Sequence, residues 1–178
     1  ANNPDWVNQK LKVGDVVYRD YDGYVMQEGI FGQAEFNREA LSVFVAGAVS
    51  NTSYWQKNHF YYDKDHEKSS TENFIGWNVK GGANYNLTDN HNVFANIGYI
   101  SRAPFYSGGV FLYALNSNAT NPDAVNEKVF SLEVGYGFRS SLFSANLNLY
   151  RTEWLDKTMT RTMDITLPDG TKDRSSIN

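Results

Sequence analysis

Val-Phe-Ser-Leu-Glu-Val-Gly-Tyr-Gly-Phe-Arg, residues 129–139, is the stretch that decides the fold class of this chain. Every second position from Phe130 on carries a large apolar side chain, and the positions between them are polar or small. Because successive side chains of a strand point to opposite faces, this period of two predicts a strand with one apolar and one polar face. The apolar face, which meets either a protein core or lipid, comprises Phe130, Leu132, Val134, Tyr136 and Phe138.

The same alternation recurs along the chain and predicts an all-β protein. Strands are expected at about residues 24–37, 41–55, 74–87, 92–102, 129–139 and 142–156. Taken in order, these strands predict an antiparallel up-and-down meander of about six long strands. Two weaker signals lie outside these ranges: a short strand near Val16–Arg19, and a hairpin turn at Leu167-Pro168-Asp169-Gly170.

The connections alternate strictly between short and long. Short ones are expected at 38–40, 88–91 and 139–141, and long ones at 56–73, at 103–128 and beyond 157. Outer-membrane barrels have this asymmetry, with tight periplasmic turns and long extracellular loops. A soluble antiparallel sheet protein has no reason to keep so strict an alternation, so the pattern favours the membrane barrel and leaves the soluble sheet as the alternative.

The positions of the aromatic residues on the apolar faces also favour a membrane. Aromatic rings favour the membrane–water interface, so aliphatic residues between two aromatic rims are expected in a bilayer-spanning strand. Lys80 must then face the lumen, because a lysine on the lipid face near the midplane costs roughly 2–4 kcal/mol. Rings lie near the long-loop ends at Trp77 and Phe130, and near the short-turn ends at Phe36, Tyr85, Tyr136 and Phe138.

Composition excludes several function classes. The chain has 178 residues, 16 basic and 20 acidic residues and no cysteine. A mildly acidic balance argues against nucleic-acid binding, and the lack of cysteine excludes disulfides and thiol chemistry. No apolar run approaches the roughly 18 residues of a transmembrane helix. The chain starts at Ala1 without a signal sequence and stops in a polar stretch, so we expect residues 1–178 to be one partial barrel domain from a longer protein.

Five segments resemble barrel strands of TonB-dependent outer-membrane receptors of the Bacteroidetes type. They occur in the order that the family has, and together they cover most of residues 24–157. The segments are Gly29–Phe36, Asn78–Leu87, Asn92–Pro104, Asn126–Lys128 continuing into Ser131–Tyr136, and Asn146–Lys157.

The resemblance implies a barrel of 22 strands, plugged by an N-terminal domain, that imports a scarce nutrient such as a siderophore, cobalamin, a glycan or a peptide. It implies the outer membrane of a Gram-negative bacterium as the location. It also implies two protein partners, the TonB energy-transducing complex and possible surface lipoproteins. This chain holds about six strands and lacks the plug, so we expect it to be a fragment of the C-terminal half of the barrel. The alternatives are a soluble or surface-attached glycan-binding β protein and a passive porin.

Receptors of this class catch their substrates on extracellular loops, where aromatic rings can stack on sugars or flat chelates. The alternative is that the same rings pack the loops onto each other. The candidate ligand-binding residues lie in two predicted long loops and are Phe60, Tyr61, Tyr62, Phe105, Tyr106, Phe111 and Tyr113.

The sequence contains no catalytic constellation, so we expect neither an enzyme nor a cofactor. A group of histidines and carboxylates in the first long loop has the chemistry of a divalent-cation site, or else of a solvated charged loop. Charges expected on the lumen side either contact a plug or are solvated. The loop group is His59, Asp63, Asp65, His66 and Glu67, and the lumen group is Glu35, Lys80, Glu133 and Arg139.

Overall fold

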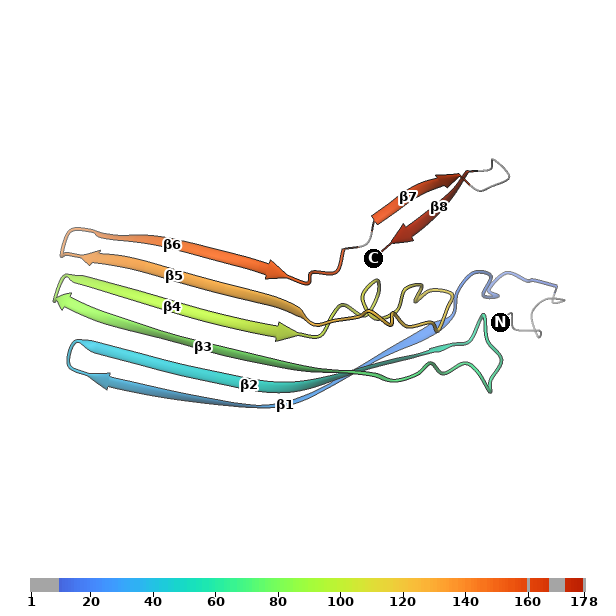
Figure 1. Ribbon diagram of the computed structural model, residues 1–178, viewed down its shortest axis with the longest axis horizontal. Coiled ribbons are helices and arrows are strands. Elements are labelled where there is room, and N and C mark those ends of the chain that lie inside the picture. Colours follow the sequence, from blue (N-terminus) through green and yellow to red (C-terminus); the bar gives the residue numbers. More distant parts are fainter. Residues whose placement is uncertain (1–9, 160, 167–171, 178) are drawn as a thin grey trace.

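A computed structural model describes residues 10–159, 161–166 and 172–177 and shows an all-β chain (Figure 1). Six strands form one sheet in which each strand pairs antiparallel with the next along the chain. The predicted meander is therefore confirmed. The strands are β1 (Tyr21–Arg38), β2 (Leu41–Asn58), β3 (Glu72–Thr88), β4 (His91–Arg102), β5 (Glu127–Arg139) and β6 (Ser144–Leu155).

The three short connections are tight hairpin turns at one end of the sheet. The β1–β2 turn has only two residues outside the strands, and Glu39 adopts a positive φ of 45° there. In the β5–β6 turn the Ser140 hydroxyl accepts hydrogen bonds from the backbone N–H groups of Leu142 and Phe143. This cap holds residues 140–143 as a turn, so β6 begins at Ser144 and not at residue 142 as predicted.

The strands next to the first long loop are longer than predicted. β1 begins at Tyr21, β2 continues to Asn58 and β3 starts at Glu72. The predicted short strand at Val16–Arg19 is wrong, because these residues are irregular. A separate hairpin is formed by β7 (Arg161–Thr166) and β8 (Lys172–Ile177). The turn predicted at 167–170 lies outside the described residues.

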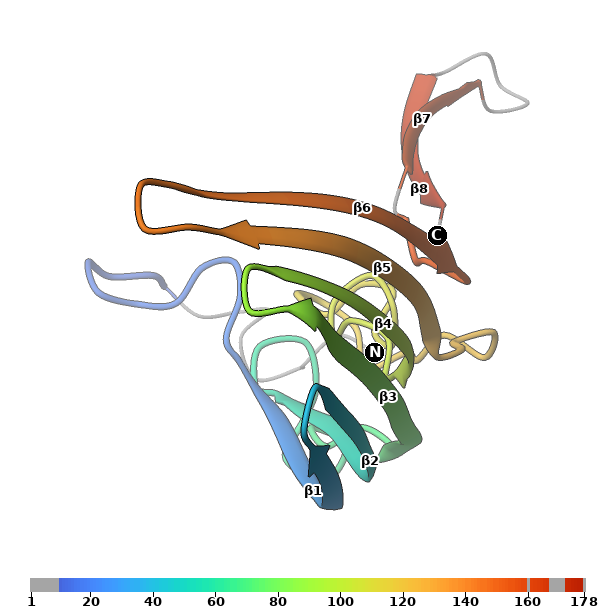
Figure 2. The same ribbon diagram turned by 90° about the vertical axis from the view of Figure 1, so that its left-hand side faces the viewer.

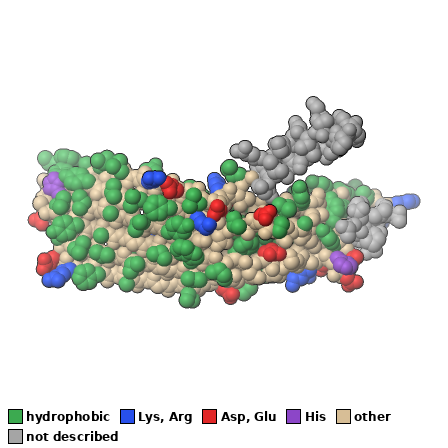
Figure 3. All heavy atoms as spheres, viewed as in Figure 1, with side chains coloured by type: hydrophobic (Ala, Val, Ile, Leu, Met, Phe, Trp, Pro, Cys, Tyr) green, Lys and Arg blue, Asp and Glu red, His purple; other side chains and the backbone are tan. Residues whose placement is uncertain are grey.

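The strand register gathers the apolar positions on one face of the sheet, here called the outer face. One row across the strands pairs Val43 with Ala83, Ala83 with Ala95, and Ala95 with Val134. Leu132 and Val134 are 40% and 43% exposed. No second layer of the described residues covers them, since all six long strands belong to one sheet. Figure 3 shows hydrophobic side chains spread along the strands.

The opposite face, here called the inner face, is polar and lies on the concave side of a sheet that curves like a section of barrel wall (Figure 2). Hydrogen bonds between amide side chains link neighbouring strands, as from Asn92 Nδ2 to Asn84 Oδ1 at 2.8 Å. Among the residues that the structure describes, no helix is long and apolar enough to cross a membrane.

The buried hydrophobic core lies at the end of the sheet that carries the long loops, not along the strands. Tyr54 of β2 packs there with Val110, Phe111 and Ala114 of the β4–β5 loop. Its hydroxyl donates a 3.0 Å hydrogen bond to the carbonyl of Pro104. The core therefore fixes the β4–β5 loop against the end of the sheet and leaves the outer face uncovered.

Candidate functional site

The two long loops fold onto each other at one end of the sheet. They are the β2–β3 loop (59–71) and the β4–β5 loop (103–126). The backbone N–H of Asn118 donates to Tyr62 Oη at 3.0 Å, and the Asn118 side chain donates to the carbonyl of Glu67 at 2.9 Å. The loops therefore form one connected structure, with segments from both at its surface.

A buried glutamine of β2 links the sheet to this structure. Gln56 is fully buried, and its Nε2 donates to the carbonyl of Ser117 at 2.7 Å and to Asn118 Oδ1 at 2.9 Å. Its Oε1 accepts a 2.8 Å hydrogen bond from Tyr106 Oη. Burial, with a smaller contribution from Tyr21, raises the pKa of Tyr106 to about 12, so this phenol remains a donor throughout the physiological range.

The structure separates the seven predicted aromatic residues into packed and exposed groups. Phe111 is 0% exposed and packs against Tyr106, with ring centroids 4.9 Å apart. Phe60 is buried against Tyr61, and Tyr62 contacts the other loop through its hydroxyl. Ligand binding by these residues stays a prediction. The two whose side chains are most open to solvent are Phe105 and Tyr113, at 55% and 50% exposed.

The structure does not bring the predicted histidine and carboxylate group together at one point: His59 lies with Glu67, and His66 with Asp63. The ring of His59 lies between Glu67 Oε2, at 2.9 Å from Nδ1, and Asp22 Oδ2, at 3.3 Å from Nε2. His66 Nδ1 lies 2.7 Å from Asp63 Oδ1. Among the described residues, no three such side chains are grouped as a metal ion requires.

Charge pairing sets the protonation of the His59 pair. Burial by itself lowers the pKa of His59, but its hydrogen bonds to Glu67 and Asp22 raise the pKa above the usual value. The same hydrogen bond lowers the pKa of the Glu67 carboxyl, with a further contribution from Lys57 at 3.2 Å. The contact between His59 and Asp22 therefore connects the β2–β3 loop to the start of β1, while the contact with Glu67 lies within the loop.

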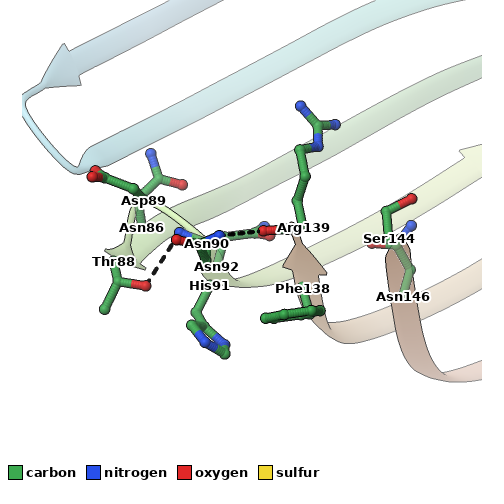
Figure 4. A pocket seen from close by; sticks show the side chains of 10 residues that line it. All are labelled: Asn86, Thr88, Asp89, Asn90, His91, Asn92, Phe138, Arg139, Ser144 and Asn146. Atoms are coloured by element: carbon green, nitrogen blue, oxygen red, sulfur yellow. Dashed lines mark hydrogen bonds between the residues drawn. The ribbon is translucent and has the colours of Figure 1, made fainter. Parts of the chain in front are cut away.

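The inner face carries the lumen charges that were predicted from sequence. Glu133 is held by the side chains of Asn96, at 3.3 Å, and Asn148, at 3.4 Å. At the short-turn end, a polar pocket of about 280 Å³ opens between β3, β4, β5 and β6 (Figure 4). Its lining includes Arg139, whose backbone carbonyl accepts a 2.6 Å hydrogen bond from Asn90.

One group of side chains at the long-loop end was not found by sequence reasoning. The Arg102 guanidinium lies 5.3 Å from the ring centroid of Phe105 and 5.5 Å from that of Trp154. Its charge is paired with Glu127, which is fully buried. Arg102 ends β4 and Trp154 is near the end of β6, so β5 lies between them and their distance in sequence hides the contact. The sequence could have indicated this contact. Arg102 and Trp154 both stand at the alternate positions of their strands that also carry the inner-face asparagines.

These features define a class of protein. A curved antiparallel sheet with an uncovered apolar face, a polar concave face, tight turns at one end and long loops at the other has the organisation of a transmembrane β-barrel wall. Charged and aromatic groups gather at the long-loop end, where stacking and hydrogen bonding can bind a solute.

Comparison with known families agrees with this class and narrows it. The family model described as "TonB dependent receptor-like, beta-barrel" matches residues 1–175. The chain belongs to this family, whose members are nutrient receptors of the Gram-negative outer membrane. Comparison with curated proteins gave no match, and comparison with solved structures gave none.

Proposed function

We propose that this chain is a segment of the barrel of a TonB-dependent receptor that binds a scarce nutrient at the long-loop end and imports it through the lumen. The single observation that carries the proposal is the division of one six-stranded sheet into an uncovered apolar face and a polar concave face. Such a sheet is stable where lipid covers the first face and water or protein fills the second.

Import by this protein uses energy delivered by the TonB complex. The substrate is a siderophore, cobalamin, a glycan or a peptide, and a surface lipoprotein assists in its capture. The Bacteroidetes type of the family, suggested by the five strand segments, fits such a partner. In this proposal the protein acts as a receptor and not as an enzyme, which fits the family of its barrel.

The ligand is bound by the long loops. Phe105 and Tyr113 offer exposed rings beside a buried core that holds the β4–β5 loop in place. A ring fixed on a rigid loop loses little conformational entropy when a ligand stacks on it. Tyr106 and Phe111 pack together in this core, and Phe60 is buried separately against Tyr61.

Cell fractionation and uptake measurements test the proposal. The native protein is expected in the outer-membrane fraction, to require detergent for extraction, and to support growth on its nutrient only in cells with an active TonB complex. Recovery of the native protein from the soluble fraction would refute the barrel. Uptake that continues without the TonB complex would show a passive porin.

A further inference from the structure

Four side chains at the long-loop end form a group that we call the cation–aromatic site: Arg102, Phe105, Trp154 and Lys157. Arg102 lies against both rings, at 5.3 and 5.5 Å from their centroids. Lys157 Nζ lies 5.1 Å from the centroid of the Trp154 ring. The indole is therefore in contact with two cations that come from different segments of the chain, and each contact is within the range of a cation–π interaction.

Arg102 is held in position by hydrogen bonds on one edge of its guanidinium. Its Nε and Nη2 donate to Glu127 Oε2 at 3.1 and 2.7 Å. The other carboxylate oxygen, Oε1, accepts from the backbone N–H of Thr158 at 3.3 Å. Because Glu127 is fully buried, it fixes both Arg102 and the segment that carries Lys157. None of these bonds uses Nη1, so one edge of the guanidinium remains available to a ligand.

The site carries positive charge and exposed ring surface together. Arg102 and Lys157 contribute two positive charges and Glu127 one negative charge. Lys157 has no ion-pair partner among the described side chains. Phe105 and Trp154 are 55% and 50% exposed. A group of side chains with only a structural role would bury its rings and balance its charges. This group instead leaves one cation and two aromatic rings exposed to solvent.

We infer that the cation–aromatic site binds a carboxylate-bearing ligand that has a flat or apolar face next to its charge. The carboxylate pairs with Lys157 and the free edge of Arg102, and the flat face stacks on Trp154 and Phe105. The inference rests on the proposed function, because it names the class of solute that the receptor takes. Two sources have this chemistry, an acidic sugar and a peptide that ends in an aromatic residue.

Binding measurements on the protein purified from outer membranes in detergent test this inference. The probes are a uronic-acid trisaccharide and a tripeptide with a C-terminal aromatic residue. Each is compared with a neutral form, the carboxyl-reduced sugar or the amidated peptide, by isothermal titration calorimetry. One carboxylate probe is expected to bind at least about tenfold more tightly than its neutral form, a ratio that corresponds to about 1.4 kcal/mol. Which probe binds identifies the source.

Variants separate ligand binding from a structural role. Lys157→Gln is expected to weaken the carboxylate probe by about tenfold while the weak binding of the neutral form is unchanged. Trp154→Ala weakens both forms. The matched control is Lys64→Gln, an exposed lysine of the β2–β3 loop that lies outside the site. Heat-modifiable mobility shows whether all three variants assemble in the outer membrane. A variant that assembles but loses binding bears on this inference, whereas failure of the wild-type protein to assemble bears on the proposed function.

Two outcomes would overturn the inference in protein that assembles in the outer membrane. The first is equal affinity, or no affinity, for the charged and neutral forms of both probes. The second is that Lys157→Gln and Lys64→Gln show the same ratio of affinities for the charged and neutral forms of the probe.

Discussion

Gly135 of β5 occupies a position on the inner face where a side chain would collide with an aromatic ring of the neighbouring strand β4. A Cβ built there meets two ring atoms of Phe94 and lies 3.0 Å from Asn148 Oδ1. Gly32 of β1 serves as the comparison, because a Cβ built at that position has nothing within 4 Å. The ring of Phe94 thus fills the space above a glycine, a packing that stabilises paired strands.

Alanine at these two glycines is expected to destabilise the protein at Gly135 but not at Gly32. Gly135→Ala displaces the Phe94 ring and lowers the free energy of unfolding by about 1–3 kcal/mol, as overpacking does. Gly32→Ala leaves it unchanged or raises it by about 0.4–1 kcal/mol, because alanine has fewer unfolded conformations than glycine. Urea unfolding in detergent micelles measures both variants. Equal stability of the two would show that the Phe94 ring can move without cost.

His59 makes the β2–β3 loop sensitive to pH. The pKa of His59 is raised in the folded protein, so the proton binds the folded state more tightly than the unfolded state. The stabilisation from its pairs with Glu67 and Asp22 is fully present below about pH 6.5, the unfolded pKa. It is lost as pH rises through the raised pKa of the folded state.

Hydrogen exchange in the loop measures this dependence. Amides of residues 59–71 are expected to exchange with smaller opening constants at pH 6 than at pH 8, after correction for intrinsic rates. His59→Gln removes the difference, and the control His91→Gln, at the start of β4 at the opposite end of the sheet, keeps it. If the wild-type loop opened equally at both pH values, the His59 pairs would contribute nothing to its stability.

At the scale of the elements, sequence pattern predicted the faces of the strands better than their ends. The alternation of β5 follows from its position between lipid-facing and lumen-facing environments, and the register confirms that its apolar residues share a face with those of β3 and β4. The extension of β2 to Asn58 was not predictable from alternation, because Gln56 and Asn58 are buried polar residues under a loop. Their strand conformation depends on contacts with residues far along the chain.

A lysine on the outer face of β5 tests the assignment of faces. Val134→Lys puts a charge in the aliphatic band between the aromatic rims, and we expect a cost of about 2–4 kcal/mol in the bilayer. Ser131→Lys places the same charge on the inner face of the same strand and should be tolerated. The folded fraction of each variant in outer membranes, from heat-modifiable mobility, measures the difference. Equal folding of the two variants contradicts a lipid-facing Val134.

The loop core offers a second prediction at this scale. Phe111→Ala removes a ring that is 0% exposed and is expected to destabilise the β4–β5 loop by about 3–5 kcal/mol. The loop then opens locally while the strands stay paired. Tyr113→Ala, in the same loop but exposed, is the control and should change little. Limited proteolysis between residues 103 and 126 compares the variants, and equal cleavage rates would contradict the packing described.

At the scale of the whole molecule, the sequence predicted the sheet and its family but not the arrangement of its loops. Strand order follows from consecutive hairpins, which alternation and turn residues reveal. The packing of Phe111 and the contact between Arg102 and Trp154 depend on irregular backbone, for which no period exists. Seven aromatic residues were therefore predicted as one site, whereas the structure buries some and exposes others. Only three-dimensional contacts could distinguish the two groups.

Residues 1–178 expressed alone are expected to associate, because the described sheet has both an apolar face and two free edges. In the six-stranded sheet, β1 pairs only with β2, and β6 only with β5. Unpaired edges and large apolar patches each promote aggregation. Without detergent, light scattering should show aggregates that bind a hydrophobic dye. In detergent, circular dichroism should show β-structure.

A triple variant, with Val45, Val79 and Leu132 changed to Thr, distinguishes the apolar face from the free edges as the cause of association. Dye binding falls in this variant if the outer face is responsible, and any association that remains comes from the edges. A monodisperse wild-type chain in detergent-free buffer would contradict the uncovered apolar face, and with it the barrel wall.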